Sequence, residues 1–162
     1  MEWEQRLADL WASFDDYSED EFLARMERLV AELPADNALA LFERASSLDS
    51  TGHSDLAVPL YQQALERGLP GQRRRQATIQ MASSLRNLGR ASESVALLTA
   101  ERELESDDLD DAVNAFLALV LVDTGREREA VSLTLTTLSR HMTRYRRSLA
   151  NYAQRIAAHP ST

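Results

Sequence analysis

Apolar residues recur every three or four positions along most of the chain, the spacing that places side chains on one face of an α-helix. Near the amino terminus two such stripes contain Trp3, Leu7, Leu10, Trp11 and Phe14, and then Phe22, Met26, Leu29, Val30 and Leu33. Further stripes predict helices over residues 36–51, 54–68, 72–88, 91–105, 108–124, 127–140 and 143–159. We therefore expect an all-α chain of about nine helices.

Polar residues at the starts of these stripes predict helix caps. Ser18 with Glu21 three positions later has the spacing of a capping box, in which each side chain bonds to the other's backbone N–H. Ser54 is the expected cap of the helix that follows it, and Asp107 or Asp108 the expected cap of the helix at 108–124.

Three predicted helices end at glycines with a regular interval. Gly52, Gly89 and Gly125 are 37 and 36 residues apart. The residues seven and four positions before each glycine are Ala45 and Leu48, Ala82 and Leu85, and Ala118 and Leu121. Self-similarity at this period is the signature of stacked helical hairpins. We therefore expect a right-handed α-solenoid.

This repeat predicts the organisation of the whole chain. We expect a single domain over residues 1–162, made of a degenerate helical hairpin at 1–35, repeats at 36–71, 72–107 and 108–141, and a capping helix at 142–159. The capping helix would cover the apolar face of the last repeat, as terminal repeats require.

Composition excludes several kinds of chemistry. The chain has no cysteine and no lysine, so it lacks a thiolate nucleophile or ligand, a Schiff-base lysine and the lysine of a phosphate-binding loop. No apolar run approaches the ~20 residues of a membrane span, and the first residues do not resemble a secretory signal. The net charge of −8 disfavours nonspecific nucleic-acid binding. We expect a soluble, cytoplasmic protein without a cofactor.

Charge is unevenly distributed along the chain. Residues 1–36 carry a net charge of −8 and residues 126–162 a net charge of +5. Solvated helix faces explain such a pattern. An alternative is a homodimer in which the acidic front meets the basic tail, with Trp3, Trp11, Tyr145 or Tyr152 buried between copies.

The remaining reactive side chains do not form a catalytic or metal-binding pattern. The acidic stretch between Glu101 and Asp111 lacks the glycine and the terminal glutamate of a calcium loop. The three histidines are scattered, and no serine has the surroundings of a nucleophile. Arg73–Arg75 open a helix, where the dipole disfavours cations, so we expect acidic partners for them, within Glu101–Asp111 or on an external anion.

The residues around the turn glycines resemble the tetratricopeptide repeat. In that family an alanine follows the glycine by five positions, an aromatic residue by nine and an alanine by twelve. The first repeat matches this pattern with Gly52, Ala57, Tyr61 and Ala64. The second has Ser94, Leu98 and Glu101 at these positions, and the third has Ala130, Thr134 and Thr137. Residues 72–89 and 145–149 further resemble small bacterial tetratricopeptide-repeat proteins of unknown function.

The resemblance implies a concave groove, formed by the first helix of each hairpin, that binds a peptide or a helix of a partner. By offset from each glycine, the groove candidates are Leu39, Phe42, Gln76, Ile79, Ser83, Arg86, Asn87, Leu119, Val122 and Asp123. The alternative is that Phe42, Ile79 and Leu119 belong to the core or lie under a terminal helix. Arg86 and Asn87 would bind a carboxylate or backbone groups of the partner, or else only satisfy their own helix end.

These observations together predict a non-catalytic scaffold for protein–protein interaction, with the self-associating structural protein as the alternative. No metal, cofactor, membrane or nucleic acid is expected to bind. The identity of the protein partner is not encoded in any motif.

Overall fold

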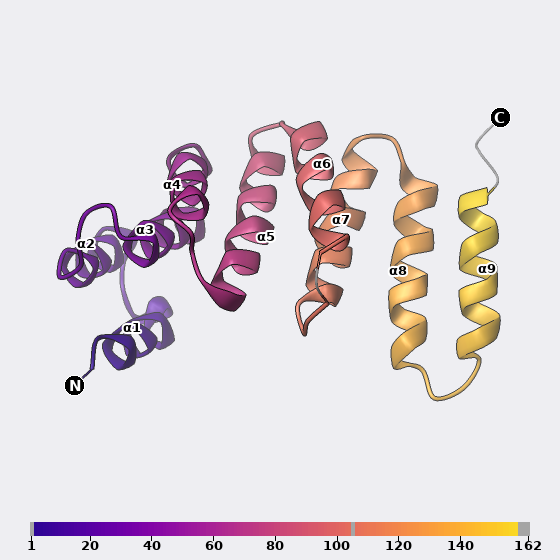
Figure 1. The fold of residues 1–162 in the computed structure, drawn as a ribbon, viewed down its shortest axis with the longest axis horizontal. Helices are drawn as coiled ribbons and strands as arrows, with labels where there is room; N and C mark the ends of the chain where they lie inside the picture. The colour runs from indigo at the N-terminus through magenta and orange to yellow at the C-terminus, as the bar shows by residue number, and fades with distance from the viewer. Residues whose placement is uncertain (1, 105, 159–162) are drawn as a thin grey trace. The chain divides into compact units, whose positions relative to one another are not determined.

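The structure, a computed structural model, describes residues 2–104 and 106–158. Their helices are α1 Trp3–Ala12, α2 Glu19–Val30, α3 Ala38–Ser50, α4 Ser54–Glu66, α5 Gly71–Asn87, α6 Ala91–Arg102, α7 Asp110–Asp123, α8 Glu127–His141 and α9 Arg146–Ala158, with a 3-10 turn at Phe14–Asp16 (Figure 1). The described residues contain no strand. The prediction of an all-α, helical-repeat fold is confirmed.

The chain divides into two compact units, residues 1–84 and 85–162. The first unit contains α1 to α4 and most of α5, and the second contains the end of α5 and α6 to α9. The expectation of a single domain over 1–162 stays a prediction.

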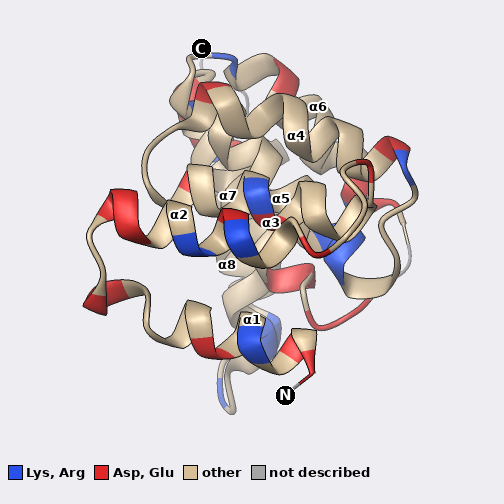
Figure 2. Cartoon of the chain, turned by 90° about the vertical axis from the view of Figure 1, so that its left-hand side faces the viewer, with Lys and Arg blue, Asp and Glu red and all other residues tan. Residues whose placement is uncertain are grey.

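Helix starts differ from the predicted ones where a better cap was available. The capping box of Ser18 and Glu21 is confirmed, and Figure 2 shows acidic residues gathered between α1 and the first turn of α2. Asn37 caps α3, because its Oδ1 accepts from the N–H groups of Leu39 and Ala40 at 2.9 and 3.2 Å. The predicted start of this helix at residue 36 is therefore wrong.

One predicted cap and two further predicted starts are also corrected. Ser54 does not cap α4, which begins at Ser54 itself, with His53 in the capping position and without a side-chain bond. The helix predicted from residue 108 begins at Asp110, because the Asp107 carboxylate accepts from the N–H of Leu109 at 2.8 Å and holds the preceding turn. The last helix begins at Arg146 and not at 143, since Tyr145 adopts a φ of 63°, outside the helical range.

The periodic glycines end helices by one shared backbone arrangement. Gly52, Gly89 and Gly125 have φ values of 88°, 73° and 73°, which side chains with a Cβ rarely adopt. In each turn the residue after the glycine donates its N–H to the carbonyl of the leucine four positions before the glycine, at 2.8–2.9 Å. This is the Schellman pattern of a helix end. The leucine and glycine of the repeat are thus joined by a backbone bond.

The first unit contains two apolar clusters. The first is formed by α1, α2 and the start of α3, where Phe22 is 1% exposed and its ring lies 5.1 Å from that of Trp11 and 4.7 Å from that of Phe14. The second is formed by α3, α4 and α5 around Tyr61, which is fully buried. Alanines at positions 45, 57, 64 and 77 are also fully buried in this second cluster, which allows the helix backbones to approach closely.

A polar network ties the three helices around Tyr61 together. Asp49 of α3 accepts from Ser84 of α5 at 2.6 Å and from Ser54 of α4 at 3.3 Å. Ser84 is fully buried, so this bond satisfies a hydroxyl that water does not reach. Asp49 therefore fixes the turn between α3 and α4 against the next helix.

In the second unit each helix packs against the next one along the chain. The buried side chains include Leu98 of α6, Val113, Leu117 and Val120 of α7, and Ala153 of α9. Helices α8 and α9 lie side by side as a hairpin (Figure 1). The described residues include no helix with both the length and the apolar composition that a bilayer crossing requires.

Candidate functional site

In the first unit, the predicted groove residues are mostly covered. Phe42 and Ile79 are 5% and 6% exposed, and Leu39, Gln76 and Ser83 are half-buried. Phe42 belongs to the cluster around Tyr61. Of the two interpretations offered for Phe42 and Ile79, this burial favours the core.

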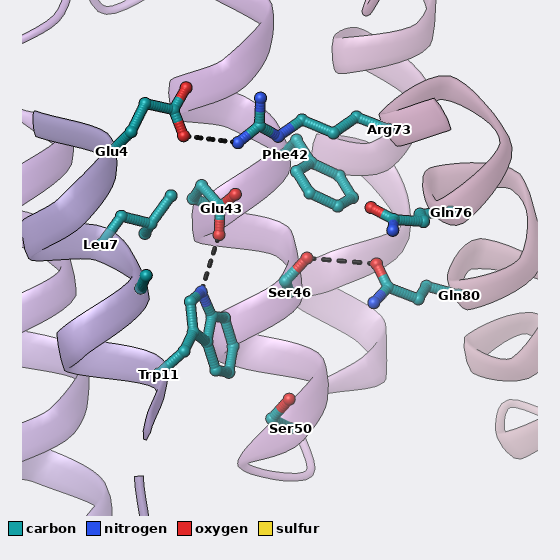
Figure 3. Close-up of a pocket in the computed structure, with 11 residues that line it drawn as sticks. Glu4, Leu7, Trp11, Phe42, Glu43, Ser46, Ser50, Arg73, Gln76 and Gln80 are labelled. Atoms are coloured by element: carbon teal, nitrogen blue, oxygen red, sulfur yellow. Dashed lines mark hydrogen bonds and ion pairs between the residues drawn. The ribbon is translucent and has the colours of Figure 1, made fainter. Parts of the chain in front are cut away.

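Helix α1 lies across the α3 and α5 side chains and leaves a cavity beneath it. This cavity, the α1 pocket, has a volume of about 440 Å³ and is lined by Glu4, Leu7, Ala8, Trp11, Phe42, Glu43, Ser46, Ser50, Arg73, Gln76 and Gln80. Figure 3 shows Glu4, Leu7 and Trp11 of α1 on one side, with Glu43 and Ser46 of α3 between them and Gln80 of α5. The amino-terminal helix thus occupies part of the predicted groove.

Two polar contacts hold α1 in this place. Trp11 Nε1 donates to Oε2 of Glu43 at 2.9 Å, and Nη2 of Arg73 lies 2.6 Å from Oε2 of Glu4. For Arg73, the predicted partner within Glu101–Asp111 is therefore wrong. The actual partner is 69 residues away in sequence, and only the packing of α1 brings it near.

Both tryptophans pack and form hydrogen bonds within the first unit. Trp3 Nε1 donates to the carbonyl of Leu29 at 2.9 Å, and both indoles pack on the cluster around Phe22. Their polar N–H groups are satisfied inside the unit, as buried indoles require. Both indoles are half-buried within the unit, and their burial between two copies of the chain stays a prediction.

Glu43 is the unusual group of the α1 pocket. Its side chain is buried, and the residue as a whole is 4% exposed. Burial raises the pKa of its carboxyl, while the bond from Trp11 and the charge of Arg73 act in the opposite direction and Glu4 adds a smaller upward effect. The charged form of Glu43 is therefore disfavoured in the folded protein.

This pKa shift predicts a pH-dependent effect of Glu43→Gln. The folded protein holds the Glu43 proton more tightly than the unfolded chain does, so ionisation costs stability as pH rises through the interval between the two pKa values. We expect Glu43→Gln to gain stability relative to the wild type as pH increases from about 4 to about 8. Urea unfolding of both proteins across this range measures the difference.

Glu32→Gln is the control of opposite sign. Arg6 lowers the pKa of Glu32 through a two-bond ion pair on the surface, so the wild type should gain stability relative to this variant as pH rises. A difference between wild type and Glu43→Gln that is constant with pH would contradict the expectation.

The second unit brings together two of the predicted groove residues. The Arg86 guanidinium, at the end of α5, pairs with both carboxylate oxygens of Asp123 on α7, and the longer of the two bonds is 3.3 Å. Arg86 therefore already has a carboxylate from its own chain, and Asn87 is exposed beside it. The sequence predicted Arg86 and Asp123 as groove residues, but it did not indicate that their charges neutralise each other.

Leu119 and Val122 belong to an open apolar surface between α7 and α8. This surface, the apolar trough, has a volume of about 570 Å³ and is lined by Ala115, Ala118, Leu119, Val122, Ala130, Val131, Thr134 and Leu135. Leu119, Val122 and Val131 are 48%, 50% and 46% exposed. Three large aliphatic side chains are thus about half exposed on one surface.

The corresponding surfaces of the other repeats are covered. Relative to the turn glycines, the positions of Ala115, Ala130 and Thr134 are those of Phe42, Ala57 and Tyr61 in the first repeat, which are all buried. In the second repeat they are those of Ile79, Ser94 and Leu98, which are also buried. In the third repeat Ala115 and Thr134 are exposed. The trough therefore corresponds to the surface that α5, the following helix, covers in the first repeat.

Helix α9 does not cover this surface. It packs against α8, and its Ala157 lines a separate hollow with Ser132, Leu133 and Thr136 of α8. The predicted capping helix thus forms, but it covers another face of the third repeat. His159, the last residue of the predicted segment, lies outside the described residues.

Among the described residues, no group of three or more histidine and carboxylate side chains is placed to hold a metal ion. His53 and His141 form surface pairs with Glu19 and Asp111 at 2.6 and 2.7 Å. These pairs link neighbouring segments.

The sequence did not predict the α1 pocket. Of the residues that line the trough, it predicted Leu119 and Val122 as groove residues. The signal for the pocket was Glu43, a charged residue that directly follows the apolar residues 38–42. The signal for the trough was Thr134, a small polar residue where the first repeat has Tyr61 and the second Leu98.

Comparison with known proteins agrees with this geometry. A family model described as "Tetratrico peptide repeat" matches residues 38–156. The chain is also similar to a solved structure named "MamA MSR-1 C2", with a TM-score of 0.62 and 20% sequence identity over 96% of this chain and 78% of that one. This likeness shows the fold, and no curated protein matched. Because the family model spans most of its length, the chain belongs to the tetratricopeptide-repeat family.

Proposed function

We propose that the chain is a non-catalytic scaffold for protein–protein interaction and that its apolar trough binds an α-helix of a partner protein. Tetratricopeptide-repeat proteins generally bind other proteins and are generally not enzymes. The observation that carries the proposal is the exposure of Leu119, Val122 and Val131 along one trough. Action without a cofactor and a cytoplasmic location are parts of the same proposal.

The first repeat supports a helix as the occupant of the trough. There the equivalent residues Phe42, Ala57 and Tyr61 are buried in one cluster with Ala77 of α5, and Met81 packs against it. The occupant of that surface is thus a helix that presents a small and a longer apolar residue one turn apart. A partner helix with an apolar face of this kind would bury the trough in the same way.

A site-specific cross-link tests the proposal in cells. A photoreactive amino acid at Val131 lies in the trough, and the same group at Leu56, which is 51% exposed on α4, is the matched control. We expect an adduct with a helical segment of another protein from Val131 and none from Leu56. Leu119→Asp should reduce the Val131 adduct at least about tenfold, since a charge in an apolar contact costs more than 1.4 kcal/mol.

The cross-linking result distinguishes a partner-binding trough from self-association and from no binding. No adduct from Val131 above that from Leu56 would refute the trough as a binding site, as would a full adduct yield in Leu119→Asp with the fold intact by circular dichroism. An adduct with a second copy of the chain would instead favour self-association. Tyr145 and Tyr152, which are 76% and 58% exposed around α9, keep that alternative open.

A further inference from the structure

The α1 pocket has both aromatic and polar side chains in its walls. It lies within the first unit, and its residues are not those of the apolar trough. Its walls combine two aromatic rings, Trp11 and Phe42, with the buried carboxyl of Glu43 and several amides and hydroxyls. A cavity with apolar walls and a few converging polar groups is the usual form of a small-ligand site.

Several polar atoms of the pocket lack a partner within the described residues. Glu43 accepts one bond, at Oε2 from Trp11, and its Oε1 accepts none. The side chains of Gln76 and Ser50 form no hydrogen bond there, and that of Gln80 uses only its Oε1, which accepts from Ser46 at 3.1 Å. A carboxylate oxygen with free acceptor capacity therefore lines the same pocket as other side chains able to accept hydrogen bonds.

The charges that line the pocket do not cancel. Glu4 and Arg73 form an ion pair at 2.6 Å and neutralise each other. Glu43, which is 4% exposed, forms no ion pair among the described residues, and the positive charge that acts on it is that of Arg73, which is already paired with Glu4. A buried carboxylate of this kind is costly until a positive group pairs with it.

We propose that the α1 pocket binds a single organic cation, a guanidinium or primary ammonium group on an alkyl stem, as carried by arginine and lysine side chains. The cationic head donates to Glu43 Oε1 and to the oxygens of Ser50 or Gln76. Its charge also interacts favourably with the faces of Trp11 and Phe42. The alkyl stem packs on Leu7 and Ala8 of α1. This proposal does not depend on the function proposed for the trough.

The two tryptophans allow a direct test by NMR. The indole N–H of Trp11 bonds to Glu43, whereas that of Trp3 bonds to the Leu29 carbonyl, which is not part of the pocket. Butylguanidinium and butylammonium are titrated separately into the full chain labelled with ¹⁵N. Either cation should shift the Trp11 indole signal with saturation and leave the Trp3 signal in place. Butanol and pentanoate, which have the same butyl stem and no positive charge, should not shift it.

Glu43→Gln separates charge recognition from packing. Glutamine keeps an oxygen that accepts from Trp11 but removes the carboxylate, so the affinity for both cations should fall at least tenfold. Glu66→Gln, which removes an exposed carboxylate outside the pocket, should leave the affinity unchanged. An unaltered Trp3 signal verifies that each variant is folded. The proposal is overturned if neither cation shifts the Trp11 signal, if butanol shifts it equally, or if Glu43→Gln binds as the wild type does.

Discussion

Tyr61→Ala is expected to lower the free energy of unfolding of the first unit by about 3–5 kcal/mol, the usual cost of removing a buried aromatic ring. Tyr61 is fully buried among side chains of α3, α4 and α5. Three of its neighbours are fully buried alanines, at positions 45, 57 and 64. The methyl groups of these alanines are too short to fill the space that the ring leaves.

Urea unfolding followed by tryptophan fluorescence measures this effect, because both tryptophans of the chain, Trp3 and Trp11, lie in the first unit. Tyr61→Phe is the control. It keeps the ring and removes the hydroxyl, which bonds to Ser46 at 3.5 Å and also interacts with Asp49, so it should cost about 1–2 kcal/mol, less than the loss of the whole ring. A loss below about 1 kcal/mol for Tyr61→Ala would mean that the ring does not support the cluster.

Leu98→Ala is expected to destabilise the second unit by about 2–5 kcal/mol. Leu98 stands nine positions after Gly89, as Tyr61 does after Gly52, and it is fully buried where α6 packs against α7. Removal of its branched end leaves a cavity beside α7, whose inward residues Val113 and Leu117 are 0% and 2% exposed.

Thermal unfolding followed by circular dichroism suits this variant, since the second unit contains no tryptophan. Thr134→Ala changes the same position of the third repeat, where the side chain is exposed, and should alter stability by no more than about 0.5 kcal/mol. Equal losses from Leu98→Ala and Thr134→Ala would contradict the assignment of these positions as covered and open.

Much of the fold follows from local signals in the sequence. The glycine interval predicted three hairpins correctly because each turn depends on a backbone conformation that glycine adopts easily and on residues within six positions of it. Helix starts were less predictable. Asn37 and Asp107 compete with neighbouring polar residues for the same N–H groups, and spacing alone does not decide between such caps.

The candidate sites depend on contacts between distant segments, which periodicity does not encode. Glu4 meets Arg73 and Trp11 meets Glu43 only because α1 packs across α3 and α5. For Arg86 the sequence predicted a carboxylate of a partner or a role at its own helix end, whereas the carboxylate that it binds, that of Asp123, lies on the next repeat. Exposure was likewise unpredictable at Leu119, since the position of α9 decides whether that side chain is covered.

The exposure of the apolar trough on the third repeat also has a consequence for the number of hairpins that a repeat protein of this kind can contain. Helical-repeat proteins gain or lose whole hairpins, and each hairpin needs a receptive neighbour on which to pack. In repeat one this surface is covered by α5, whereas the third repeat presents Leu119, Val131 and Thr134 uncovered. A further hairpin that began with a helix like α5 would therefore find apolar side chains already exposed for packing. In this respect the third repeat resembles the first repeat without its α5.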